Sequence, residues 1–164
     1  MHSPLAFKIL KGVIAPKRDA EYYGEEQVEA ADYPRKVRRR AAMLLRLVAA
    51  MQPSFVWISQ DAPPLLAEAV RLAGGAIRIF DGKLYPKEIA KADLIVLHGA
   101  KGIRKNLPAM GSERPAPPIV LALDIPADVK EKIMKGVASG VIFEWEDSLL
   151  AIPRNDSERY VYSI

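Results

Sequence analysis

Short apolar runs alternate with helical patterns through the middle of the chain. Each run ends on a polar or acidic residue that is followed by a turn-forming residue. The runs cover residues 55–58, 76–80, 94–97 and 119–123. Near-continuous apolar runs of this length are typical of strands that are buried on both faces of a parallel sheet.

Helical patterns lie between and after these predicted strands. They predict helices over residues 64–73, 86–92 and 127–139. Strands that alternate with helices predict an α/β fold, here a three-layer Rossmann-like domain with a mainly parallel sheet.

The two ends of the chain have a different pattern. Residues 7–14 mix apolar residues with lysines and predict a strand with a break at Gly12. Residues 141–145 and 149–152 flank a polar turn and predict an antiparallel C-terminal hairpin, and residues 159–164 predict a last strand. Because chain ends often lie close together, we expect the first strand to pair with this C-terminal group.

The clearest helix covers residues 35–51, and a short helix is predicted before it at residues 25–31. The apolar residues of the longer helix recur at steps of three and four and form one stripe. They are Val37, Ala41, Leu44, Val48 and Met51. We expect the basic residues on the opposite face and its flanks, namely Arg35, Arg39 and Arg46, flanked by Arg38 and Arg40.

The length of the chain predicts one domain, residues 1–164, and the charge and the pattern divide this domain into three segments. Residues 1–53, the predicted N-terminal strand and basic helix, carry ten Lys or Arg and six Asp or Glu, so the net charge of +4 lies there. Residues 54–140 hold the βα repeats and residues 141–164 the hairpin. The six acidic residues of segment 19–32 precede the arginine helix, and one interpretation is that the two segments neutralise each other.

Composition narrows the chemistry. The chain has no cysteine, which excludes disulfides, thiolate zinc sites and a cysteine nucleophile. Thirteen prolines together with many charged residues suggest a thermophilic source. We find neither a transmembrane segment nor a secretory signal in the sequence and expect a cytoplasmic protein.

The residues that follow the predicted strands form the first candidate site. In open parallel sheets, ligands bind beyond the carboxyl ends of the strands. Asp61, Asp81, His98 and Asp124 occupy such positions. The three aspartates are candidate ligands for Mg²⁺ or Mn²⁺, and His98 and Asp124 are candidate catalytic residues. The alternative is that these aspartates are ordinary helix caps and turn residues.

The segment after the third of these strands is the second candidate site. Its glycines, Gly99 and Gly102, let backbone amides approach a ligand, and Lys101, Arg104 and Lys105 supply charge that suits phosphate. The spacing is neither that of a P-loop nor that of a dinucleotide fingerprint. The alternative is a solvated surface loop.

Three hypotheses for function follow. The first is a binding protein for a phosphate-bearing ligand, foremost nucleic acid or a nucleotide, which uses Arg35, Arg38, Arg39 and Arg46 together with the Gly99–Lys105 segment. The second is a metal-dependent enzyme that acts on a phosphoester or nucleotide at the strand ends. The third is a non-catalytic subunit of a homo-oligomer, with the hairpin edge or the aromatic C-terminal segment as its interface.

Overall fold

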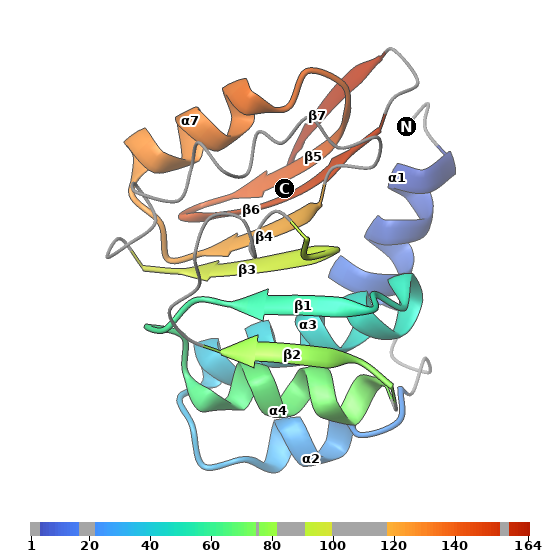
Figure 1. Ribbon diagram of the computed structural model, residues 1–164, viewed down its shortest axis with the longest axis vertical. Coiled ribbons are helices and arrows are strands. Elements are labelled where there is room, and N and C mark those ends of the chain that lie inside the picture. Colours follow the sequence, from blue (N-terminus) through green and yellow to red (C-terminus); the bar gives the residue numbers. More distant parts are fainter. Residues whose placement is uncertain (1–3, 17–21, 75, 82–90, 100–117, 155–157) are drawn as a thin grey trace. The chain divides into compact units, whose positions relative to one another are not determined.

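The computed structural model describes residues 4–16, 22–74, 76–81, 91–99, 118–154 and 158–164 (Figure 1). The fold is α/β, and its mixed seven-stranded sheet has the order β2-β1-β3-β4-β6-β5-β7. Contacts divide the chain into two compact units. Unit 1 comprises Met1–Ser54 with Pro63–Ile79, and unit 2 comprises Phe55–Ala62 with Phe80–Ile164.

Unit 1 is built from helices, and its longest helix organises it. Helix α3 packs against α4, α2 and the π-helix η1. The predicted bounds of α3 and α4 are confirmed, and α2 ends one residue before the predicted limit. The elements are α1 (Pro4–Ile9), η1 (Leu10–Ile14), α2 (Glu25–Ala30), α3 (Arg35–Met51) and α4 (Pro64–Ala73).

The prediction of a strand over residues 7–14 is wrong, because this segment is helical. The buried residues of α1 and η1 are Ala6, Ile9 and Val13, which are spaced by three and four as on one face of a helix. Pro4 stands at the start of α1, where a proline fits a helix. The expected pairing of this segment with the C-terminal strands is therefore wrong as well.

Unit 2 holds most of the sheet. Strand β3 is parallel to both β1 and β4, whereas β6 is antiparallel to both β4 and β5, and β7 is parallel to β5. The strands are β1 (Phe55–Ile58), β3 (Leu94–His98), β4 (Ile119–Leu123), β5 (Gly140–Trp145), β6 (Ser148–Pro153) and β7 (Arg159–Ser163), and β2 (Arg78–Asp81) is next to β1 in the sheet order.

The C-terminal hairpin makes the sheet mixed. The two residues between β5 and β6 are Glu146 and Asp147, and Glu146 has a φ of 39°. A positive φ is typical of the tight turns that join antiparallel strands. The predicted antiparallel hairpin is thus confirmed. Because β6 then pairs with β4, the chain reverses direction inside the sheet, and parallel pairing does not extend through it.

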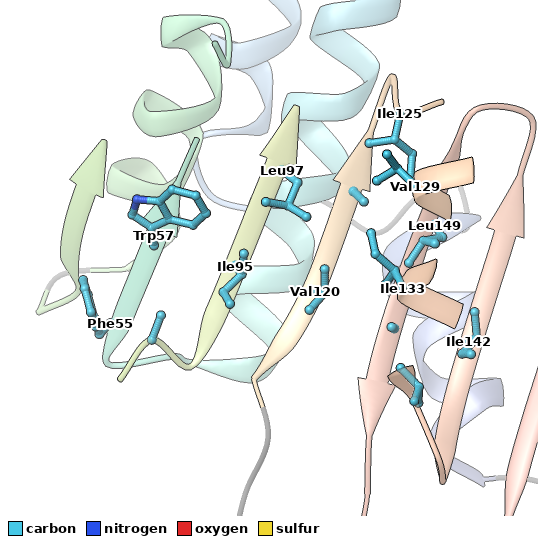
Figure 2. Close-up of a cluster of buried hydrophobic side chains, with 14 residues drawn as sticks. Phe55, Trp57, Ile95, Leu97, Val120, Ile125, Val129, Ile133, Ile142 and Leu149 are labelled. Carbon is cyan, nitrogen blue, oxygen red and sulfur yellow. The ribbon is translucent and has the colours of Figure 1, made fainter. Parts of the chain in front are cut away.

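One face of the sheet in unit 2 packs against α7 (Ala127–Gly136), as Figure 2 shows. Val129 and Ile133 of α7 belong to one buried cluster with alternate residues of the strands, among them Ile95 of β3 and Val120 of β4. Trp57, which the sequence predicts as a core residue, is 3 % exposed in this cluster. This packing fixes the strands whose carboxyl ends carry the candidate site.

Candidate functional site

The carboxyl ends of β1, β3 and β4 meet at one edge of the sheet. Ile58 is in register with Val96, and His98 is in register with Leu123. Backbone hydrogen bonds continue one residue further, since Ser59 N–H donates to the Val96 carbonyl over 2.9 Å and Gly99 N–H donates to the Leu123 carbonyl over 3.1 Å. The side chains of Ser59, His98 and Asp124 therefore start from neighbouring points on this edge.

His98 and Asp124 form a pair at this edge. Nε2 of His98 lies 3.1 Å from Oδ2 of Asp124, and the side chains are 19 % and 32 % exposed. In the neutral imidazole one ring nitrogen donates and the other accepts. A carboxylate only accepts, so the neutral ring that fits this contact carries its proton on Nε2 and its lone pair on Nδ1. The pair thus fixes both the tautomer and the orientation of the ring.

Ser59 supports His98 from the neighbouring strand. Its side-chain oxygen accepts a hydrogen bond of 2.9 Å from the backbone N–H of His98, and Ser59 is buried. This bond holds the main chain of His98 at the end of β3. Ser59 is not among the predicted site residues, although it is the first polar residue after an apolar strand.

The chain turns sharply at two residues of this edge. Asp124 has a φ of 51° and Gly99 a φ of 73°, both in the left-handed region. Glycine adopts this conformation without strain, whereas a residue with a side chain does so at a cost that aspartate and asparagine bear better than most. The next residue, Ile125, is held by a bond from its N–H to the Asp147 carbonyl over 2.9 Å. This turn directs the Asp124 carboxylate to His98.

Of the other two aspartates predicted at the strand ends, only the Asp61 side chain is described, and the structure does not bring it to this pair. Asp61 is an exposed residue of the turn that follows β1. It does not cap α4, whose N-cap is Pro63 without a side-chain hydrogen bond. Asp81 ends β2, and its side chain lies outside the described part. Among the described residues, no group of three or more acidic or histidine side chains is placed to hold a metal ion.

The basic segment after β3 is described only at its first residue. Gly99 is described, and no described atom lies within 4 Å of where a Cβ would stand on it. Lys101, Gly102, Arg104 and Lys105 lie outside the described residues, as does most of the predicted helix 86–92.

Arg46 departs from its expected place on the solvent-facing side of α3. It is buried, its Nε donates to the Val13 carbonyl over 2.7 Å, and its Nη1 donates to Oε1 of Glu25 over 2.5 Å. The physical reason is that η1 and α2 cover this part of α3. Arg46 thus stabilises unit 1, and it pairs with an acidic residue of segment 19–32 on a buried face of α3 and not on a solvated one.

The remaining arginines of α3 divide into two groups. Arg40 is buried, and Arg38 donates from Nη1 to the Glu29 carbonyl over 2.7 Å. Arg35 and Arg39 are exposed and lie one helical turn apart. A ligand in solution could therefore meet the first turns of α3 more readily than its middle.

Comparison with known proteins adds no relative. No protein-family model, no curated protein and no solved structure matches this chain. Within the described ranges, no helix combines the length and the apolar character that a bilayer crossing requires.

Proposed function

We propose that the edge formed by β1, β3 and β4 is the active site of an enzyme that acts on a phosphate-bearing substrate. The observation that supports this proposal is the pairing of His98 with Asp124 over 3.1 Å at the carboxyl ends of adjacent parallel strands. Ligands of open, Rossmann-like sheets bind beyond these ends. Partly exposed side chains there can reach a ligand.

In this proposal His98 moves a proton. Nδ1 takes the proton from the water or hydroxyl group that attacks phosphorus, and the positive ring that results is stabilised by the Asp124 carboxylate on Nε2–H. Ser59 is a positioning residue, because its hydroxyl bonds the main chain of His98 and not its ring. The proton leaves Nδ1 again for the leaving oxygen or for solvent.

The substrate class rests on charge in the sequence. Lys101, Arg104 and Lys105 follow His98 within seven residues of the chain. Cationic side chains near a histidine favour a phosphate-bearing substrate over a neutral one. Phosphate monoesters, phosphate diesters and nucleotides share this chemistry.

The test uses two chromogenic probes, p-nitrophenyl phosphate and bis(p-nitrophenyl) phosphate. We expect the intact chain to hydrolyse at least one of them, and His98→Gln and Asp124→Asn to lower kcat at least about 100-fold. The matched control is His2→Gln, which removes the other histidine of the chain and leaves kcat unchanged.

A second measurement tests binding apart from turnover. We expect inorganic phosphate to shift the imidazole NMR signals of His98 and to leave those of His2 in place. The proposal is overturned if the chain hydrolyses neither probe and phosphate shifts neither signal, or if His98→Gln keeps the full rate.

The metal-dependent form of this proposal adds Mg²⁺ or Mn²⁺, with Asp124 as a ligand. It predicts that either cation raises the melting temperature of the intact chain and that Asp124→Asn removes this shift. An equal shift in the variant would contradict a role for Asp124 as a ligand.

A second candidate function is nucleic-acid binding by α3. The exposure of Arg35 and Arg39 on successive turns favours it. Each phosphate contact contributes close to one unit to the slope of log K against log salt. We expect Arg35→Gln with Arg39→Gln to lower this slope for mixed-sequence RNA or DNA by about two, while Lys132→Gln, an exposed control on α7, leaves it unchanged. An unchanged slope in the double variant would exclude this surface.

A further inference from the structure

Strand β7 ends the sheet of the described residues, next to β5 (Figure 1). Its residues alternate between exposed and half-buried, and Val161 is 41 % exposed. Natural edge strands commonly carry lysine, proline or a bulge, which prevents pairing with another chain. Residues 159–163 contain neither lysine nor proline, and their register with β5 continues without a bulge. As far as the described residues show, this edge is therefore open to another strand.

The backbone bonds of β7 show which of its groups face outward. Gly140 N–H donates to the Glu158 carbonyl over 2.8 Å, and Ile164 N–H donates to the Glu144 carbonyl over 2.9 Å. Glu158 and Ile164 thus direct their backbone groups to β5. Since this direction alternates along a strand, Arg159, Val161 and Ser163 direct their N–H and C=O groups away from β5.

We propose that β7 pairs antiparallel with β7 of a second copy of this chain, around a twofold axis that passes Val161. In this register Val161 lies opposite Val161, and Arg159 lies opposite Ser163 of the second copy. Each of these opposed pairs exchanges two backbone hydrogen bonds. The outward groups of all three residues are then satisfied in both copies.

Neighbouring registers satisfy fewer groups. A shift by two residues places Val161 opposite either Arg159 or Ser163 and leaves the outward groups of the third residue without a partner strand. A twofold axis also makes the contact closed and self-complementary, so that it ends at two copies. The register centred on Val161 is therefore the one that the strand itself favours.

The side chains suit the same register. Ser163 donates from Oγ to Oε1 of Glu144 over 2.8 Å, and Nη2 of Arg159 donates to the Met134 carbonyl of its own chain over 3.0 Å. The register therefore places each Arg159 opposite a serine and not opposite a like charge. On the opposite face, Tyr160 of one copy lies across from Tyr162 of the other. Aromatic neighbours across strands are favourable. No charged residue of β7 meets itself.

Single cysteines test the register, because the chain has no cysteine of its own. Opposed Cα atoms of a hydrogen-bonded antiparallel pair lie about 5.5 Å apart, within the range of a disulfide. We expect mild oxidation to convert Val161→Cys to a covalent dimer. Two copies of Arg159→Cys place their thiols roughly 13 Å apart along the strands, too far to bond.

The matched controls use the same positions. Arg159→Cys alone and Ser163→Cys alone should stay uncrosslinked, whereas an equimolar mixture of the two should crosslink. Crosslinking of Arg159→Cys alone, or no crosslinking of Val161→Cys, would overturn the proposed register.

Sedimentation equilibrium of the cysteine-free chain tests the association itself. We expect twice the chain mass. Val161→Pro should weaken the dimer at least about tenfold, because proline removes the N–H that faces the second copy and leaves the hydrogen bonds to β5 intact. Val161→Lys should dissociate it by placing like charges on the axis, and mixing with Val161→Glu should restore it. A monomeric wild-type chain, or an unchanged dimer in Val161→Pro with an intact fold by circular dichroism, would overturn the proposal. The hydrolysis assay does not enter this test, so the two proposals stand or fall separately.

Discussion

Nη1 of Arg46 lies 2.5 Å from Oε1 of Glu25 and joins α3 to α2 within unit 1. The side chains are only 10 % and 15 % exposed, and Arg46 also bonds the Val13 carbonyl of η1. One guanidinium therefore connects three helical elements. These two charges of the N-terminal segment therefore stabilise the packing of unit 1.

We predict that Glu25→Ala lowers the free energy of unfolding by about 3 kcal/mol, because it leaves the buried Arg46 charge without its partner. The measurement is urea unfolding followed by circular dichroism. The control is Glu26→Ala, an exposed neighbour on the same helix, which should change the free energy by less than about 0.5 kcal/mol. Equal effects of the two variants would show that the pair contributes nothing.

Alanine substitutions at Gly140, which starts β5, and at Gly136, which ends α7, form a matched comparison of stability. Gly140 has a φ of 127°, and a Cβ there would lie 2.3 Å from the Ile152 carbonyl oxygen. Gly136 ends α7 and has no described atom within 4 Å of an added Cβ. We predict that Gly140→Ala destabilises the protein by at least about 2 kcal/mol, whereas Gly136→Ala stabilises it by up to about 1 kcal/mol. Thermal melting checks both, and a tolerated Gly140→Ala would contradict the close approach.

Two variants of Asp124 distinguish its effect on stability from its effect on activity. At the Asp124 φ of 51°, an alanine has a conformational free energy about 1 kcal/mol higher than a glycine. We predict that Asp124→Gly unfolds with a higher free energy than Asp124→Ala, although both lose the carboxylate and should be equally inactive toward the chromogenic probes. Urea unfolding of the two variants measures the difference. Equal stabilities would mean that the turn relaxes when the carboxylate is removed.

Glu144 gives a pH dependence whose sign follows from its contacts. The hydrogen bond from Ser163 lowers the pKa of Glu144 below its ordinary value of 4.5, burial opposes this, and Lys130 lowers the pKa further. The folded state therefore favours the ionised carboxylate. This contribution to stability is full above pH 4.5 and is lost as the pH falls through the lowered pKa of the folded state.

We accordingly predict that Ser163→Ala is less stable than the wild-type chain at pH 7 and that the difference shrinks toward pH 3. The effect is small, because the Glu144 side chain is 27 % exposed and solvent screens its charge. Melting temperatures across this pH range measure it. In a Glu144→Gln background, Ser163→Ala should show no such pH dependence, and a difference that persists there would assign the effect to another group.

The sequence predicted those elements whose pattern is local. Residues 35–51 and 119–123 have the bounds that their apolar spacing indicates, because each buries a face that its own residues define. The strand prediction for residues 7–14 is wrong, since Lys8 and Lys11 interrupt the apolar residues at spacings that suit either structure. Ala6, outside the predicted strand, belongs to the helical face.

The candidate site was predicted in part for the same reason. The strand-end rule selected His98 and Asp124, which the parallel register of β3 and β4 brings together. Ser59 was missed because its role depends on the backbone of the neighbouring strand, which no local pattern encodes. Arg46 was assigned to solvent because a helical wheel of α3 contains no information about α2 and η1.

The division of the chain between its units has a practical consequence. The backbone passes from one unit to the other after Ser54, after Ala62 and after Ile79. Strand β1 therefore belongs to unit 2, although the segments before and after it in the sequence belong to unit 1. A gene fragment that starts at residue 80 would lack β1 and leave β3 with only one of its two parallel neighbours, β4. Neither unit can be produced as one uninterrupted polypeptide, and studies of either half require a circularly permuted or spliced gene.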